Sequence, residues 1–192
     1  MNVKDMLRQA SDAAKQLITL SDQTIIGILK ETAQVLRTHT EEVLAANRQD
    51  LERMDPANPK YDRLKLTEER LQGIAADMEN VSTLPSPLNK VLSETIRPNG
   101  MVIRKVTVPF GVIGVIYEAR PNVTFDVFSL CFRSGNVCVL KGGSDADFSN
   151  RALVRIIHSV LERQGINPAV CTLLPPDLSL IHISEPTRPL YI

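Results

Sequence analysis

Tryptophan is absent from this sequence, and aromatic residues of all kinds make up only 4% of its 192 residues. Its three cysteines, Cys131, Cys138 and Cys171, have neither metal-site nor redox-pair spacing, so each is predicted to be a small buried hydrophobic residue. There is no excess charge of either sign, because 22 basic residues balance 22 acidic ones, and this argues against a nucleic-acid partner. No apolar run is long enough for a membrane span, and the first residues lack the apolar block of a secretion signal. These absences predict one cytoplasmic globular domain that binds neither nucleic acid nor membrane.

Residues 1–90 have the periodicity of amphipathic helices. Ser21 is a predicted cap for the second helix, and Thr38 with Glu41 is a candidate capping box for a third. Thr67, followed by two glutamates, opens a fourth helix that ends before Pro85. The charged residues of these helices are interpreted as a solvated face.

Residues 91–108 change to an alternating pattern around Asn99-Gly100, which is a strong signal for a β-hairpin. From the residues alone, it is interpreted as a plain surface hairpin that covers the edge of a sheet.

Residues 109–177 alternate between short apolar runs and helical patterns. The run 111–117 is typical of a strand buried on both faces of a parallel sheet, and the runs 137–140 and 170–174 supply two more strands. Helical patterns separate them, ending at Gly135 and Gly165. Right-handed crossovers would make these strands parallel neighbours whose loops open at one edge. The predicted fold class is therefore α/β, with amino-terminal helices, a hairpin and an incomplete Rossmann-like sheet.

The loops at this edge hold the candidate site residues. Gly142 and Gly143 would let the backbone approach a ligand, and the ammonium group of Lys141 could meet a ribose hydroxyl or a phosphate. Asn122 could donate to an oxyanion, and a helix amino-terminus favours anions. The alternative is structural: Lys-Gly-Gly is commonly a turn, and an asparagine after proline is commonly a cap.

The segment PFGVIGVIYEARPNVT, residues 109–124, resembles the gamma-glutamyl phosphate reductase family of the aldehyde dehydrogenase superfamily. The resemblance extends from about the first helix to about Pro175. It implies NADPH-dependent reduction of L-glutamyl 5-phosphate to L-glutamate 5-semialdehyde in proline biosynthesis, by a homo-oligomer whose hairpin contributes to the subunit contact. It also implies that residues 1–177 are part of an NADP-binding domain.

The resemblance further implies roles for single residues. Asn122 would be the oxyanion donor, and Arg120 would meet a substrate carboxylate. Lys141 would contact the adenosine ribose of NADP, with Gly142, Gly143 and Ser144 beside its 2′-phosphate. The family's nucleophilic cysteine belongs to a later catalytic domain, and nothing here matches its surroundings, so the nucleophile is expected to be absent from this chain.

After Pro175-Pro176-Asp177 the sequence departs from the family pattern. Residues 178–192 have no sustained period and resemble a translated sequencing adapter, so this tail is predicted to be non-native. Two alternatives remain for function: a related oxidoreductase such as a coenzyme A-acylating aldehyde dehydrogenase, or an inactive nucleotide-binding fragment with an exposed, aggregation-prone sheet edge.

Overall fold

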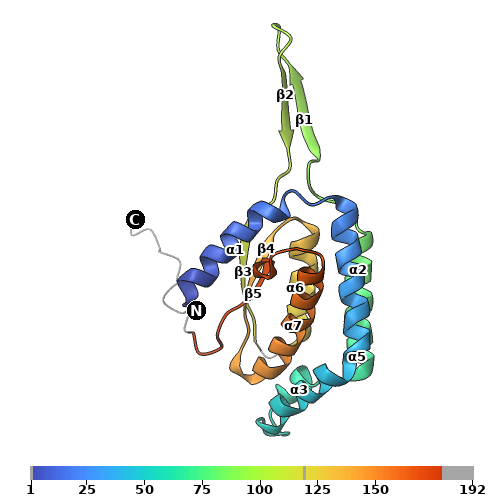
Figure 1. Ribbon diagram of the computed structural model, residues 1–192, viewed down its shortest axis with the longest axis vertical. Coiled ribbons are helices and arrows are strands. Elements are labelled where there is room, and N and C mark those ends of the chain that lie inside the picture. The colour runs from blue at the N-terminus through green and yellow to red at the C-terminus, as the bar shows by residue number, and fades with distance from the viewer. Residues whose placement is uncertain (1, 119, 179–192) are drawn as a thin grey trace.

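The computed structural model describes residues 2–118 and 120–178. Helices surround a small parallel sheet, and a hairpin projects away from this body (Figure 1). The predicted non-native tail, 178–192, lies outside the described residues except for Leu178. No helix among the described residues is both long and apolar enough to cross a membrane.

Five helices form the amino-terminal half, as the periodicity predicted for four of them. They are α1 Val3–Leu17, α2 Asp22–Thr38, α3 Thr40–Glu52, α4 Tyr61–Leu64 and α5 Glu68–Thr83. The predicted caps are confirmed at Ser21, which accepts from the Thr24 amide, and at Thr67, which accepts from the Arg70 amide. The capping box of the third helix is wrong. Thr38 is still helical as the last residue of α2 and donates its hydroxyl to the Val35 carbonyl, so it is not free to cap α3.

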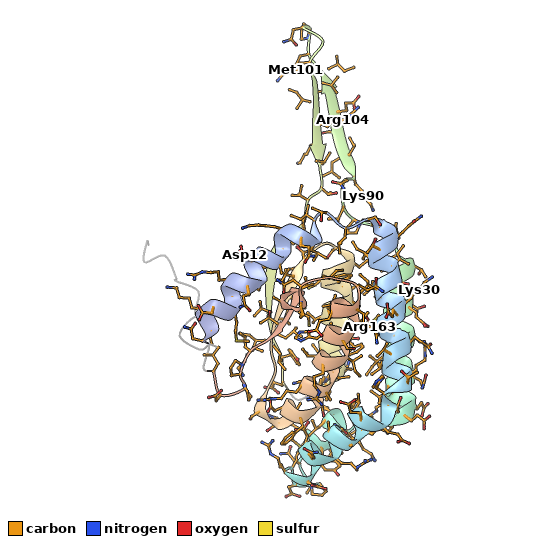
Figure 2. The ribbon with its side chains drawn as sticks, viewed as in Figure 1. Asp12, Lys30, Lys90, Met101, Arg104 and Arg163 are labelled. Atoms are coloured by element: carbon orange, nitrogen blue, oxygen red, sulfur yellow. The ribbon has the colours of Figure 1, made fainter. Side chains whose placement is uncertain are left out.

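The hairpin is confirmed as strands β1 Val91–Ile96 and β2 Val102–Val106, paired antiparallel. Gly100 adopts a φ of 83° in the turn, a conformation that favours glycine. Both faces are exposed, and Figure 2 shows Met101 and Arg104 on the part that projects from the body. The interpretation that it covers a sheet edge is wrong, because β1 and β2 form a separate two-stranded sheet.

The carboxyl-terminal half is the predicted parallel sheet, in the order β3-β4-β5. Its elements are β3 Val112–Ile116, α6 Asn122–Arg133, β4 Val137–Lys141, the short η1 Ser144–Ala146, α7 Asp147–Arg163, η2 Pro168–Val170 and β5 Cys171–Leu173. One detail differs from the prediction, since β3 is not buried on both faces. Val112 and Ile116 are 39% and 59% exposed, because β3 is an edge strand and α1 and α6 pack mainly on the central β4.

The core is formed by the buried faces of the sheet and of helices α1, α2, α3, α5, α6 and α7. Three phenylalanines of α6, Phe125, Phe128 and Phe132, are buried there, and the rings of the last two stack with centroids 5.2 Å apart. Arg133 ends α6 and donates to the carbonyl of Leu84 and the carboxylate of Asp22. These bonds join α6 to the end of α5 and the start of α2. They therefore hold in place the helix that carries Asn122.

Candidate active site at the carboxyl edge of the sheet

Strands β3 and β4 end side by side. Ile116 pairs with Lys141, and the Tyr117 amide donates to the Lys141 carbonyl at 3.1 Å. The chain then leaves β3 toward α6 and leaves β4 toward α7. The two loops that carry the predicted site residues therefore start from neighbouring positions, as the strand order predicted.

Lys141 is half-buried and directed toward the end of β5. Its Nζ donates to the carbonyls of Gly142 and Pro176, at 2.9 Å in each case. An ammonium group has three donors, so one remains for a ligand. The position is compatible with a ribose hydroxyl or a phosphate oxygen at the end of β4.

Gly142 is buried, and the side chain of Asn150 fills the space beside its Cα atom. A Cβ atom built on Gly142 would lie 2.3 Å from Nδ2 of Asn150 in α7. This contact is a reason for glycine at 142 that does not involve a ligand. Gly143 is half-buried and Ser144 is exposed, so these two residues are the more accessible part of the predicted turn.

A buried chain of hydrogen bonds lies beside the turn at Gly142 and Gly143. The hydroxyls of Tyr117 and Thr124 lie 2.7 Å apart, and Thr124 donates to Oδ1 of Asn150 at 3.0 Å. Burial raises the pKa of Tyr117 to about 12, so the phenol stays protonated at neutral pH. The chain ties β3, α6 and α7 together where their loops meet.

The amino-terminus of α7 already holds an internal anion. The Asp50 carboxylate of α3, itself 1% exposed, accepts from the amides of Phe148 and Ser149 at 3.1 and 2.7 Å. It also accepts from the Ser149 hydroxyl at 2.6 Å. At α7 these amide donors are therefore taken by Asp50 and are not left for a ligand anion. Sequence reasoning missed this tertiary cap, since nothing local relates positions 50 and 149.

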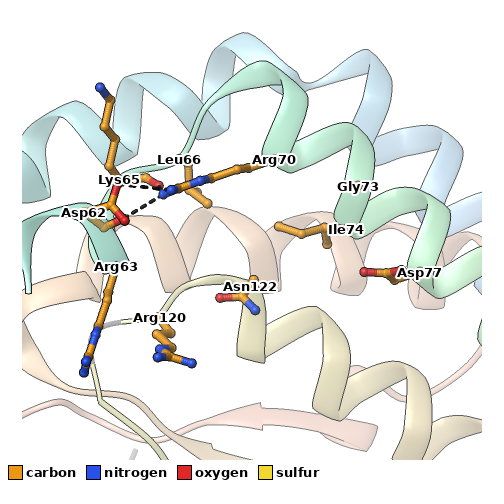
Figure 3. Close-up of a pocket in the computed structure, with 10 residues that line it drawn as sticks. All are labelled: Asp62, Arg63, Lys65, Leu66, Arg70, Gly73, Ile74, Asp77, Arg120 and Asn122. Atoms are coloured by element: carbon orange, nitrogen blue, oxygen red, sulfur yellow. Dashed lines mark hydrogen bonds and ion pairs between the residues drawn. The ribbon is translucent and has the colours of Figure 1, made fainter.

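Asn122 lies in the first turn of α6 and lines a cavity of about 330 Å³ together with Arg120 (Figure 3). Its Nδ2 donates to Oδ2 of Asp126 at 3.0 Å, which fixes the orientation of the amide. Burial raises the pKa of the Asp126 carboxyl, and the bond from Asn122 opposes that shift. An amide held in this way retains a second N–H, as an oxyanion donor requires.

The opposite wall of this cavity comes from α5, whose charged residues are interpreted as a solvated face, and from the segment just before it. Arg63, Lys65 and Arg70 lie there, with Asp62 and Asp77. Arg70 donates to the Lys65 carbonyl at 2.6 Å and to the Asp62 carboxylate at 3.1 Å. This wall could not be predicted from local sequence, because α4 is a four-residue helix with no resolvable period and its charges look like ordinary surface residues.

The structure thus divides the predicted site residues into two groups. Arg120 and Asn122 share the cavity, whereas Lys141 is directed toward Pro176 and does not line that cavity. The two groups lie on loops that follow the adjacent ends of β3 and β4, but they face different parts of this edge of the sheet.

None of the three cysteines is suited to act as a nucleophile. All are buried, as predicted, and burial raises the pKa of Cys131 to about 12. The pKa of Cys138 is also well above its usual value, because of its hydrogen bond with Cys171 and its burial. Among residues 2–118 and 120–178 there is no cluster of three or more side chains that could hold a metal ion.

Known proteins that resemble this chain point to one family in sequence and fold. The chain is 99% identical over 177 residues to a gamma-glutamyl phosphate reductase of Parabacteroides distasonis and 60% identical over 176 residues to one of Bacteroides thetaiotaomicron; each match covers 92% of this chain. It spans only 43% and 42% of the lengths of those relatives. No protein-family model matches the sequence.

The solved structures agree. A gamma-glutamyl phosphate reductase of Thermotoga maritima matches 93% of this chain with a TM-score of 0.87 and 30% identity, and the match covers 44% of that protein. A probable aldehyde dehydrogenase of Listeria monocytogenes matches 89% of the chain with a TM-score of 0.66 at 17% identity, covering 36% of that protein, which shows a shared fold. The resemblance to gamma-glutamyl phosphate reductases and the predicted α/β fold class are confirmed.

Proposed function

Because the chain matches gamma-glutamyl phosphate reductases over nine-tenths of its length, we propose that it is the amino-terminal part of one such enzyme. The longer protein reduces L-glutamyl 5-phosphate to L-glutamate 5-semialdehyde with NADPH, as a step of proline biosynthesis. Residues 1–177 form part of its NADP-binding domain. The observation that carries the proposal is the Asn122 amide, held by Asp126 and directed to a cavity with basic side chains.

Asn122 is the oxyanion donor of this proposal. Attack on the acyl carbon of the substrate develops negative charge on its carbonyl oxygen, and a donor fixed in advance stabilises that charge without reorganisation. Asp126 positions the amide through one N–H and leaves the other for the substrate. Arg120, in the same cavity, binds an anionic group of the substrate.

The residues at the end of β4 fit the adenosine part of NADP. Lys141 retains one donor for the ribose, and Gly143 and Ser144 are accessible beside it. The amino-terminus of α7 does not fit the pyrophosphate, because Asp50 occupies it. When bound, the cofactor supplies the hydride; this chain contributes the binding of its adenosine end.

The chain by itself is proposed to be inactive. Its three cysteines are buried, with the pKa of Cys131 raised to about 12, whereas thioester formation needs an accessible thiolate. We place the subunit contact of a homo-oligomer on the hairpin, whose apolar side chains are exposed on both faces.

The test uses the Parabacteroides distasonis reductase as the full-length protein. Alanine at its position matching Asn122 should lower kcat with L-glutamyl 5-phosphate by about 10² to 10³-fold, the usual cost of losing one oxyanion donor. NADPH should bind saturably to the 192-residue chain in calorimetry, and glutamine in place of Lys141 should weaken that binding. Unchanged kcat would remove Asn122 from the chemistry, and turnover by the 192-residue chain would contradict its proposed inactivity.

A further inference from the structure

We propose that Thr124 and Asn150 are positioning residues that couple the turn at Gly142 and Gly143 to the first turn of α6, and so to Asn122. Both side chains are buried, at 0% and 1% exposure, and we assign them an action through their neighbours and not on a ligand. A nucleotide bound at the turn fixes the orientation of the Asn122 amide through them. This inference rests on the proposed function and deepens it, because it gives the cofactor end of the site an influence on the oxyanion donor.

A closed set of contacts, which we call the Thr124 network, joins Tyr117, Thr124, Gly142 and Asn150. The hydroxyl groups of Tyr117 and Thr124 lie 2.7 Å apart, and Thr124 donates to Oδ1 of Asn150 at 3.0 Å. Asn150 and Tyr117 also border Gly142, since a Cβ atom built there would lie 2.3 Å from Nδ2 of the asparagine and 3.4 Å from Cζ of the tyrosine. The network therefore connects the ends of β3 and β4 with the starts of α6 and α7.

The α7 side of the network is held in place by α3. The Asp50 carboxylate accepts from the amides of Phe148 and Ser149, in the first turn of α7. Asn47 supports the same turn, because its Nδ2 donates to the Ser149 hydroxyl at 3.0 Å. Asn150 is the next residue, so its side chain starts from a backbone that two residues of α3 fix.

The α6 side of the network depends more on Thr124. The N-cap residue of α6 is Pro121, which has no side-chain acceptor to cap the helix. Thr124 lies in the first turn, two residues after Asn122, and its bond to α7 gives this turn an anchor outside the helix. Asn122 is tied only within the helix, to Asp126 at 3.0 Å. A shift of the first turn therefore moves the Asn122 amide, and the Thr124 hydroxyl limits that shift.

The polar character of the network makes the link directional. A buried hydroxyl or amide that loses its partner costs free energy, so the arrangement in which Tyr117, Thr124 and Asn150 are all bonded is favoured. Gly142 has no side chain to absorb a displacement, so movement of its backbone toward α7 displaces Asn150 directly. That movement breaks or strains the bond to Thr124, and it reaches Asn122 through the first turn of α6.

The experiment titrates the 192-residue chain with adenosine 2′,5′-bisphosphate and follows amide signals by NMR. This probe is the adenosine end of NADP without the nicotinamide. Because the turn and Asn122 face different parts of the sheet edge, a change at Asn122 reports transmission through the protein. In the wild-type chain, the backbone amides of Gly142 and Gly143 and the side-chain amide of Asn122 should shift with the same dissociation constant.

Thr124→Val removes the hydroxyl and keeps the shape of the side chain. It should abolish the Asn122 shift and change the dissociation constant of the probe by less than about fivefold, the factor for one hydrogen bond. Thr124→Ser keeps the hydroxyl and should keep the shift. Thr32→Val is the matched control, because Thr32 is equally buried and its hydroxyl donates to the Ile28 carbonyl of its own helix. Persistence of the shift in Thr124→Val, or its loss in Thr32→Val, would sink the assignment.

Asn150→Leu cuts the same link from the other side. Leucine has nearly the shape of asparagine, and the hydroxyl groups of Tyr117 and Thr124 still bond to each other in this variant. It should also abolish the Asn122 shift, so the inference can be tested even if Thr124→Val does not fold. A retained shift in a folded Asn150→Leu chain would contradict the coupling.

The full-length Parabacteroides distasonis reductase gives a kinetic test. Valine at its position matching Thr124 should lower kcat per folded enzyme by about tenfold, as expected when a reacting group is displaced, and leave KM for NADPH nearly unchanged. Serine at that position should restore kcat. A purely structural role would lower the yield of folded enzyme without lowering its kcat, and that result would refute the inference.

The titration also separates this inference from the proposed function. Probe binding at Gly142 and Gly143 with an unmoved Asn122 side chain would refute the coupling alone and leave the proposed function standing. Failure of the probe to bind at the turn would refute the cofactor part of the proposed function, and the coupling with it.

Discussion

Gly142 occupies a position where a single methyl group has no room. Its built Cβ would lie 2.3 Å from Nδ2 of Asn150 and 3.4 Å from the Tyr117 ring, and Asn150 is itself held by Thr124. Gly142→Ala should therefore lower the free energy of unfolding by about 1–3 kcal/mol, the usual cost of overpacking. Urea denaturation measures this.

Gly27 is the matched control for that substitution. It lies exposed in α2 with nothing within 4 Å of a built Cβ. Gly27→Ala should raise the free energy of unfolding by about 0.5–1 kcal/mol, because alanine is the better helix former. An unchanged stability of Gly142→Ala would mean that Asn150 moves aside freely, which would contradict the rigidity assigned to the turn.

Asp50 predicts a specific pH dependence. Burial raises the pKa of this carboxyl, and its bonds to Ser149 only partly oppose the shift. The folded chain thus holds the Asp50 proton more strongly than the unfolded chain, so Asp50 contributes stability at low pH that is lost as the pH rises through the raised pKa. Asp50→Asn removes this titration. The stability of the wild-type chain relative to Asp50→Asn should fall as the pH rises from about 4, the usual carboxyl pKa.

Urea unfolding of both proteins at a series of pH values checks this prediction. Asp12→Asn, on the exposed face of α1, is the control for replacing an aspartate by asparagine. A wild-type advantage that grows with pH would mean that the hydrogen bonds to Ser149 and Phe148 outweigh burial.

At the scale of elements, the hairpin is the part most independent of the body. Its strands pair with each other in a sheet of their own, and its ends are already close, since the Asn89 amide donates to the Thr107 carbonyl at 3.0 Å. Replacing residues 91–106 with a short Gly-Ser turn should change the free energy of unfolding by less than about 1 kcal/mol, because little apolar area is buried against the rest of the chain. A larger loss in denaturation would show that the hairpin packs on the body.

Elements with strong local signals were predictable from the sequence. The Asn99-Gly100 turn, the caps Ser21 and Thr67 and the three parallel strands follow from spacing and turn chemistry. Features that depend on distant residues were not. The cap of α7 by Asp50 joins positions 99 residues apart, and the exposure of β3 depends on which elements pack beside it.

The same distinction applies to the candidate site. Asn122 and Lys141 stand out locally, one after a proline and the other before two glycines. Their partners do not, because Asp126 looks like any helical acid and Arg63 like any surface cation. The site could be predicted as an edge of the sheet, but the cavity could be found only once α4 and α5 were placed against α6.

At the scale of the whole molecule, the sheet leaves apolar surface uncovered. It has three strands, and the described residues pair nothing with the outer edge of β3. Phe110, just before β3, is 93% exposed, and Ile116 at its end is 59% exposed. Together with the apolar hairpin, this surface suits association with further protein.

This surface predicts that the isolated chain associates as its concentration rises. Sedimentation at about 100 µM, within the range where exposed apolar surface drives association, should give a mass above the 21.3 kDa of one chain. The double variant Phe110→Ser with Ile116→Thr should return the mass toward that value. Ile18→Thr, which removes an exposed apolar side chain at the end of α1, should not. If the double variant associates as strongly as the wild type, the contact does not lie at Phe110 and Ile116. The hairpin is then the next surface to test, because β1 and β2 also expose apolar side chains. Sedimentation of the chain in which a Gly-Ser turn replaces residues 91–106 tests it.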